Sequence, residues 1–166
     1  SIFYDYDIQN GDSPEIIAHK YYGSVYRYWM VLYANNILDP QSEWPMSDSQ
    51  FNDFLKDKYS LDAGGGDVFY YTQTTNHHYE QTISTSDEVT LQLNSITTWI
   101  DEDTYNSLIP FTTTRSINGV NTTYTVDKKA VSIYDYESSI NEDKRKINIL
   151  KDTYAVDAET QFQTLM

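Results

Sequence analysis

Two adjacent histidines, His77 and His78, are the residues whose type best suits metal binding. Imidazole nitrogens are common zinc ligands, but a zinc site needs three or four protein ligands around the ion. Neighbouring side chains on a strand point to opposite faces, and no cysteine or second histidine cluster completes the set. The sequence therefore predicts that the pair lies in a loop or at a hairpin tip and that the chain binds no metal.

An acidic triplet, Asp101-Glu102-Asp103, supplies oxygen ligands of the kind that calcium prefers. The triplet lacks the alternating spacing and the glycine of a calcium-binding loop, so we interpret it as a solvated turn that caps a helix. Three glycines at 64–66 are not followed by the lysine and hydroxyl residue of a phosphate-binding loop. We interpret them as a flexible joint.

Hydrolytic chemistry has no distinct set of residues in this sequence. A Ser-His-Asp triad would have to use His19, His77 or His78, and no nucleophile-elbow pattern accompanies any of them. Carboxylate pairs suited to glycoside hydrolysis are so numerous in this acidic chain that their presence indicates nothing. We therefore expect no catalytic residues, no cofactor and a protein that is not an enzyme.

The chain has 166 residues, enough for a sizeable core, and a formal net charge of −14. Its acidic residues are spread over both halves, which disfavours partners such as nucleic acid or an anionic membrane surface. The lack of cysteine excludes disulfides, and no apolar run approaches the length of a membrane span. Because the sequence starts at Ser1 rather than Met, we expect the native N-terminus to be processed, disordered or absent from it.

Local signals predict a strand followed by a helix at the start of the chain. Residues 3–8 alternate aromatic and acidic side chains, which is typical of a strand. Asp12 or Ser13 can cap the helix, and Pro14 suits its first turn. Gly23 can then end the helix in the left-handed conformation.

The rest of the chain predicts an α+β fold with a β-hairpin-rich middle and C-terminal helices. Helices are expected from 24 to near 39, from Ser47 or Asp48 to the glycines, over 133–144, and from Asp157 onward. Strands are expected at 68–72, 79–83, 89–93 and 97–100, with 147–150 either a strand or a helix extension. The pair Asn118-Gly119 predicts a tight hairpin between 111–117 and 120–126.

Residues 3–46 contain Gly11-Asp12-Ser13 before the first helix, Tyr22-Gly23 after it, and Tyr28-Trp29, Asn36 and Pro40 around the second. This region resembles a LysM module, a family whose sugar-binding members hold N-acetylglucosamine polymers in a shallow groove between two loops. The resemblance implies a groove made by Gly11, Asp12, Ser13 and Pro14 facing Asn36, Ile37, Leu38 and Asp39. The same residues serve as helix caps and turns, and we favour that structural use over sugar binding.

Residues 41–47 depart from the LysM pattern because they lack the glycine and the alternation of a returning strand. The modified arrangement is similar to the LysM-containing baseplate wedge protein of T-even-like contractile-tailed phages, the gene product fifty-three family. This resemblance rests on Pro14-Glu15, Tyr22-Gly23, Tyr28-Trp29, residues 36–40, Trp44, residues 134–150 and residues 157–166. It implies a LysM-like domain at 1–46 and a wedge-specific docking region at 47–166.

What the wedge resemblance implies is a structural protein of the phage tail, assembled in the host cytoplasm, with six copies per baseplate. Each copy would hold adjacent wedges together and bind other wedge proteins during tail assembly. We expect Tyr26, Tyr28 and Trp44 to be interface anchors against basic partner surfaces, and Trp29 to fill the core. Two alternatives remain open: a LysM module that recognises peptidoglycan or chitin, and a tail adaptor of a related injection machine.

Overall fold

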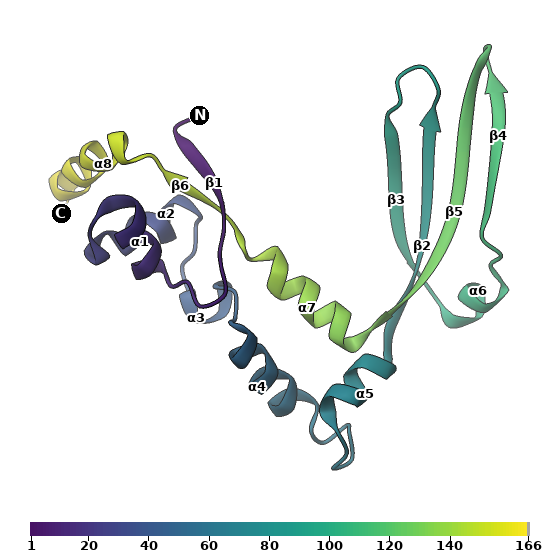
Figure 1. Cartoon of the computed structure of the whole chain (residues 1–166), viewed down its shortest axis with the longest axis horizontal. Coiled ribbons are helices and arrows are strands. Elements are labelled where there is room, and N and C mark those ends of the chain that lie inside the picture. The colour runs from purple at the N-terminus through teal and green to yellow at the C-terminus, as the bar shows by residue number, and fades with distance from the viewer. Residues whose placement is uncertain (166) are drawn as a thin grey trace. The chain divides into compact units, whose positions relative to one another are not determined.

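The computed structural model describes residues 1–165, except for the side chains of Ile117 and Leu165. Its helices and its two antiparallel sheets give a mixed α/β fold, as the sequence predicts (Figure 1). In chain order the elements are β1 (Phe3–Asp7), α1 (Pro14–Tyr22), η1 (Val25–Arg27), α2 (Tyr28–Ala34), α3 (Pro40–Glu43), α4 (Asp48–Tyr59), α5 (Val68–Thr74), β2 (Asn76–Asp87), β3 (Leu93–Ile100), α6 (Glu102–Ser107), β4 (Phe111–Ile117), β5 (Val120–Ser132), α7 (Ile133–Asp143), β6 (Lys146–Leu150) and α8 (Asp152–Leu165).

Two compact units divide these elements. The first unit combines residues 1–58 with the residues from 138 onward, and the second unit contains residues 59–137. The first unit thus joins the two ends of the chain. The predicted LysM-like domain at 1–46 and docking region at 47–166 are a division by function, and this division stays a prediction.

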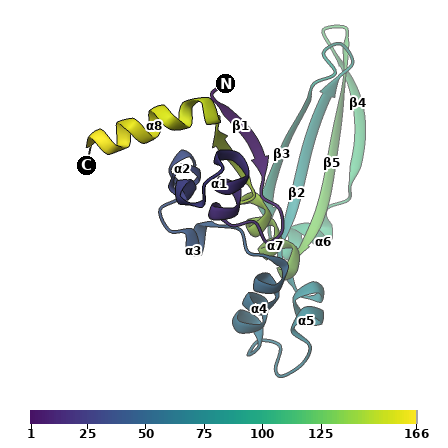
Figure 2. The same cartoon turned by 60° about the vertical axis from the view of Figure 1, so that its left-hand side comes forward.

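The core of the first unit is built around the pairing of β1 with β6. These strands run antiparallel, with Phe3 opposite Leu150, and lie side by side in Figures 1 and 2. Along β6, polar residues alternate with the buried Ile147 and Ile149, so one face of the small sheet is apolar. Helices α1 and α2 and the start of α8 complete a core of Ile8, Ile17, Ala18, Tyr22, Met30, Val31, Ile147, Ile149 and Ala155.

Helix α1 begins and ends where the sequence predicts. The Ser13 hydroxyl accepts the N–H of Ile16 at 3.3 Å, and Pro14 occupies the first turn, where a missing N–H costs nothing. Gly23 takes a φ of +66° and donates its N–H to the carbonyl of His19 at 3.0 Å. These local contacts fix both ends of the helix.

The second helix is shorter than the sequence predicts. The segment expected to be one helix forms the short 3-10 turn η1, then α2, and then the single turn α3. Asn36 has a φ of +54°, and its N–H donates to the carbonyl of Tyr33 at 3.2 Å. The left-handed Asn36 ends α2, because asparagine tolerates this conformation better than other non-glycine residues.

The second unit is dominated by a four-stranded antiparallel sheet in the order β3-β2-β5-β4. The four strands are long and form a twisted sheet (Figures 1 and 2). Asn118 and Gly119, with φ values of +53° and +81°, form the turn between β4 and β5. The predicted hairpin is confirmed, since such a two-residue turn needs positive φ at both positions.

The strand predicted at residues 68–72 is wrong, because these residues begin helix α5. The carboxylate of Asp67 accepts the N–H groups of Phe69 at 2.9 Å and Tyr70 at 3.3 Å. This N-terminal cap starts a helix in a segment whose aromatic and β-branched residues favour a strand.

The strand predicted at residues 89–93 is also wrong, because residues 88–92 form the connection between β2 and β3. The carboxylate of Asp87 accepts the N–H groups of Val89 at 3.0 Å and Thr90 at 2.6 Å. Leu91 has a φ of +54°, which breaks any extended run. The apolar residues Val89 and Leu91 therefore lie in a turn, and both are exposed.

The predicted C-terminal elements are mostly confirmed. Asp101 caps α6 by accepting the N–H of Thr104 at 2.8 Å, and α7 closely matches the helix expected over 133–144. The open choice at 147–150 is settled as strand β6. The last helix, α8, begins at Asp152 rather than at Asp157.

The sheet of the second unit has two faces of different chemistry. Aligned positions on the four strands place Ile96, Ile83, Val126 and Phe111 in one apolar row across the sheet. On the opposite face, threonine hydroxyls pair across strands: Thr82 with Thr97, Thr112 with Thr125, and Thr114 with Thr123, at 2.9 to 3.2 Å. In the apolar row only Val126 is buried, so most of this row faces solvent.

Candidate functional site

Asp12 is the centre of the loop between β1 and α1. Its carboxylate accepts hydrogen bonds from the Tyr6 hydroxyl at 2.6 Å, the Lys20 ammonium at 2.7 Å and the Gln9 N–H at 3.1 Å. The side chain is only 7% exposed. Burial by itself would raise the pKa of Asp12, but the hydrogen bonds from Lys20 and Tyr6 outweigh it and hold that pKa below its ordinary value.

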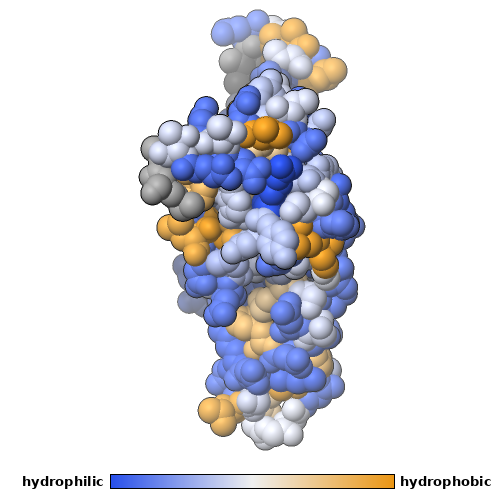
Figure 3. Space-filling view, turned by 90° about the vertical axis from the view of Figure 1, so that its left-hand side faces the viewer, coloured by the Kyte–Doolittle hydropathy of each residue, from blue (hydrophilic) through white to orange (hydrophobic). Residues whose placement is uncertain are grey.

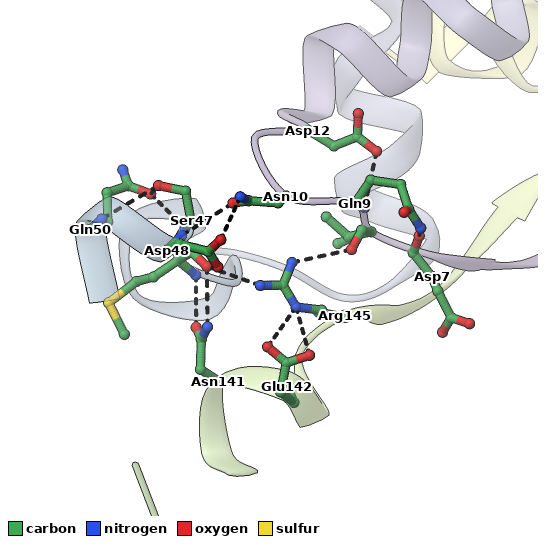
Figure 4. A network of polar contacts seen from close by, with 12 residues as sticks. Asp7, Gln9, Asn10, Asp12, Ser47, Asp48, Gln50, Asn141, Glu142 and Arg145 are labelled. Atoms are coloured by element: carbon green, nitrogen blue, oxygen red, sulfur yellow. Dashed lines mark hydrogen bonds and ion pairs between the residues drawn. The ribbon is translucent and has the colours of Figure 1, made fainter. Parts of the chain in front are cut away.

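Trp44 connects this loop to the segment that precedes α4. Its indole N–H donates to the carbonyl of Asp12 at 2.9 Å, and its ring packs against the core of the first unit. Asn10 adds a second connection, since its amide donates to the Asp48 carboxylate at 2.8 Å and accepts the Asp48 N–H at 3.1 Å. The loop is thereby fixed to the start of α4 (Figure 4).

Two residues near the end of α7 hold the same region from the other side (Figure 4). Asn141, 4% exposed, accepts the N–H of Met46 at 2.7 Å and donates to its carbonyl at 3.1 Å. Arg145 donates to the carbonyls of Ile8 at 3.2 Å and Met46 at 3.3 Å, while Glu142 accepts from its Nε at 2.8 Å. Sequence reasoning missed both residues, because their backbone partners lie 95 to 137 positions away in the chain and no local pattern marks them.

An open hollow of about 350 Å³ lies in this network. It is lined by Gln9, Gly11, Asp12, Ser13, Trp44, Pro45, Ser47, Ser49, Gln50 and Arg145. Three of the predicted groove residues, Gly11, Asp12 and Ser13, thus line this hollow together with Trp44. As far as the described residues show, the loop at 36–39 contributes none of the lining.

The loop at 36–39 has its own internal contacts. The N–H groups of Leu38 and Asp39 donate to one oxygen of Glu43 at 2.7 and 2.8 Å. Asp39 in turn caps α3 by accepting the N–H of Gln41 at 3.1 Å. The Leu38 side chain is 91% exposed. The polar groups of this loop therefore stabilise the loop itself, and a sugar-binding role for residues 11–14 and 36–39 stays a prediction.

Asn35, which sequence reasoning did not single out, joins α2 to the small sheet. Its amide donates to the carbonyls of Val31 and Asn148, both at 2.8 Å, and accepts the N–H of Asn148 at 2.7 Å. These bonds satisfy the backbone of β6 on the side away from β1. The paired asparagines at 35 and 36 thus have separate structural tasks.

The expected interface anchors differ in exposure. Tyr26 is 84% exposed and Tyr28 is 42% exposed, whereas Trp44 is partly buried.

Trp29 packs against the core, as predicted, and stacks on Phe162 with ring centres 4.7 Å apart. An apolar hollow of about 320 Å³ beside it is lined by Phe3, Trp29, Met30, Tyr33, Ala34, Leu150 and Ala158. Figure 3 shows hydrophobic patches separated by hydrophilic side chains.

The prediction that His77 and His78 lie in a loop or at a hairpin tip is wrong, because both residues belong to strand β2. Their side chains also do not point to opposite faces of that strand. The register between β2 and β5 shifts between Asn76 and His78, and such a bulge redirects side chains. The two Nδ1 atoms lie 2.9 Å apart, with His78 stacked on Trp99 and His77 stacked on Tyr136. Among the described residues, no group of three or more His, Cys, Asp or Glu could hold a metal ion.

The fold and these surfaces define a mixed α/β protein whose loops are held by internal polar contacts and whose aromatic and aliphatic side chains are available for protein contacts. The chain belongs to the family described as base plate wedge protein 53, which matches residues 2–166. Membership gives it a structural role in a phage tail baseplate, in association with other baseplate proteins. No curated protein matches the chain significantly.

Within the described part of the chain, none of the helices has the length and apolar character needed to cross a membrane.

Proposed function

We propose that this protein joins adjacent wedges of a contractile-tail baseplate during tail assembly in the host cytoplasm. One copy serves each wedge, six copies serve each baseplate, and the protein works through binding surfaces and catalyses no reaction. The observation that carries this proposal is the family match over residues 2–166, because it spans both compact units. Both units therefore take part in the same wedge function.

The described surface supports this role through exposed apolar side chains. Tyr26, Tyr33 and Leu38, all in the first unit, are 78% to 91% exposed, and such side chains are typical of interface anchors. The net charge of −14 favours partners with basic surfaces and raises the rate at which they meet. Of the predicted anchors, Tyr26 and Tyr28 have the most area to bury against a partner, while Trp44 positions the loop beside it.

Reconstitution of wedges from purified components tests the proposal. The other wedge proteins are mixed with and without this chain, and ring formation is followed by sedimentation velocity and negative-stain microscopy. We expect rings only when the chain is present, and fewer with Tyr26→Ala than with the matched control Tyr70→Ala, an exposed tyrosine of the second unit. Equal ring formation without the chain contradicts the proposal.

The alternative function is binding of N-acetylglucosamine polymers by a LysM-like module at residues 1–46. The hollow beside Gly11, Asp12 and Ser13 is the feature that favours it. We propose instead that the LysM-like region is a scaffold, because Asp12 and Asp39 are already engaged by hydrogen bonds within the chain. Amide-shift titration with a chito-oligosaccharide distinguishes the two: saturable shifts confined to residues 11–14 and 36–39 overturn the scaffold proposal.

A further inference from the structure

Strand β3 forms one edge of the four-stranded sheet and pairs only with β2 among the strands that the structure describes. Its eight residues, Leu-Asn-Ser-Ile-Thr-Thr-Trp-Ile, include no charge, proline or glycine. The register with β2 runs without a bulge from Tyr79 opposite Ile100 to Ser86 opposite Leu93. Edge strands usually carry lysine, proline or a bulge that prevents pairing with another chain, and β3 has none of these.

The opposite edge of the sheet provides a contrast. Strand β4 is one residue shorter than β3, and Arg115 places a charge near its middle. Every residue of β3 except Ile100 is exposed. The described side chains of β4 are similarly exposed, so it is the lack of a charge that leaves β3 as the less protected edge.

Apolar side chains project from both faces of β3. Ile96, 67% exposed, continues the apolar row through Ile83, and Trp99 and Leu93 lie on the opposite face at 62% and 69% exposure. A strand added beside β3 would meet apolar neighbours on each of its faces, because side chains on adjacent strands align across the sheet. Main-chain hydrogen bonds would supply affinity, and these neighbours would select the sequence.

Acidic residues stand at both ends of this uncharged strand. Asp87 and Glu88 precede the connection to Leu93, and Asp101, Glu102 and Asp103 follow Ile100 directly. Glu88 and the triplet are exposed, although Glu88 also accepts hydrogen bonds from the N–H and amide of Asn121 on β5, and Asp101 caps α6. The charge pattern of the edge, negative at both ends and neutral between them, is complemented by a segment with basic ends and an uncharged centre.

The same charges argue against a second copy of this chain as the occupant. Antiparallel pairing of two β3 strands would place Glu88 of one copy beside the acidic triplet of the other. Like charges at such distances are repulsive, and each chain already carries a net charge of −14.

We propose that the free edge of β3 accepts an extended segment of another baseplate protein as a fifth strand of the sheet. The segment has an uncharged centre with apolar or β-branched residues on both faces and has Lys or Arg at both ends. The source of the segment rests on the proposed function, whereas the chemistry of the edge is independent of it.

A synthetic peptide tests the edge directly in the full chain. The probe has two lysines, eight alternating threonine and valine residues, and two further lysines. We expect it to slow amide hydrogen exchange at least tenfold at outward-facing positions of Leu93–Ile100 and to leave Phe111–Ile117 unchanged. A version with glutamate ends and a version N-methylated at alternate residues are expected to give no protection.

Three variants sharpen the test. Ser95→Lys places a charge on β3, and Ser116→Lys makes the same change at an exposed serine of β4. We expect the first to weaken peptide binding at least fivefold and the second to leave it unchanged, with circular dichroism confirming the fold of both. The double variant Glu102→Gln, Asp103→Asn should weaken binding and reduce its salt dependence.

The proposal is overturned if the lysine-ended peptide gives no protection, if the glutamate-ended or N-methylated peptide binds equally well, or if protection falls equally on β4. It is also overturned if the chain alone sediments as a dimer with β3 protected, because a second copy is then the occupant. If the peptide does not protect β3 while ring formation still requires the chain, only the inference about the added strand is wrong. If the peptide binds while rings form without the chain, only the assembly role is wrong.

Discussion

The first unit has a core of fully buried aliphatic side chains, whereas the sheet of the second unit leaves most of its own in solvent. Ile17, Val31 and Ile149 are fully buried in the first unit, while Ile96 and Leu93 of the second are 67% and 69% exposed. Burial of apolar area is the main favourable contribution to folding, and exposed apolar patches mark interaction sites. The comparison indicates that the buried core of the first unit contributes most to stability, and that the sheet offers apolar surface for partners in addition to the exposed Tyr26, Tyr33 and Leu38 of the first unit.

Polar contacts follow the same contrast. In the first unit they join residues about a hundred positions apart, as in the bonds of Asn141 and Arg145 to Met46. In the sheet they join neighbouring strands through threonine hydroxyls. The first unit is therefore expected to unfold as one cooperative structure in which the two ends of the chain separate together.

The largest expected effect compares one isoleucine from each unit. Ile149→Ala should destabilise the protein by about 2–5 kcal/mol, because it leaves a cavity beside fully buried neighbours. Ile96→Ala should change stability by less than about 0.5 kcal/mol, since its side chain is mostly in solvent. Urea unfolding followed by circular dichroism measures both, and equal losses would contradict the contrast between the units.

Alkaline pH gives the next test of the first unit. Burial, with a further contribution from the Asp152 carboxylate, raises the pKa of Tyr22 to about 12 from an ordinary value of 10.0. The folded protein holds this proton more tightly, so its stabilising effect is complete below pH 10 and is lost as the pH rises toward 12. The loss should reach about 2–3 kcal/mol.

Tyr22→Phe should remove this part of the pH dependence. At neutral pH the variant loses only the hydrogen bond to the Leu150 carbonyl, about 1 kcal/mol. Tyr26→Phe, at an exposed tyrosine, is the matched control and should keep the wild-type pH profile. An unchanged alkaline profile in Tyr22→Phe would show that burial of this hydroxyl does not govern it.

Loss of a helix cap should have a smaller effect. Ser13→Ala removes the hydroxyl that accepts the N–H of Ile16 and should cost about 1 kcal/mol. Ser13→Thr keeps a hydroxyl and should cost much less. Thermal unfolding of the two variants measures the difference, and equal losses would assign the effect to packing rather than to capping.

The smallest expected effect concerns the ion pair between Asp12 and Lys20. Asp12→Asn should cost about 0.2–1 kcal/mol at neutral pH, because the lysine side chain is 47% exposed and solvent screens the pair. The pKa of Asp12 is lowered on folding, so its contribution is present above the ordinary value of 3.8 and is lost as the pH falls through the folded value. The difference between the urea midpoints of wild type and variant should therefore shrink as the pH is lowered from neutral to below 3.8. A constant difference between them would contradict this account.

The residues whose roles are predicted correctly from the sequence contact only neighbours within a few positions of the chain. Ser13 and Gly23 set the ends of α1, and Asn118-Gly119 set the β4–β5 turn, through backbone contacts within one turn of chain. The helix at α5 was missed because its aromatic and β-branched residues favour strands. The local signal that could have identified it was Asp67, whose carboxylate caps the helix.

The candidate site was only partly predictable for the same reason. The sequence singled out Asp12 and Trp44 but placed them in different roles, and the hydrogen bond that joins them spans 32 positions. Asn141 and Arg145 were missed because nothing near them in the chain indicates a backbone partner at Met46 or Ile8.

The sequence by itself determined the acidic charge, the lack of cysteine, the caps and turns, and the resemblance to a baseplate wedge family. Only the tertiary structure decided that β1 pairs with β6 and that β3 is left as an open edge. It also decided that a bulge brings His77 and His78 together. The physical reason is that caps and turns depend on contacts within a few residues, whereas strand pairing depends on which apolar faces can be buried together across the whole chain.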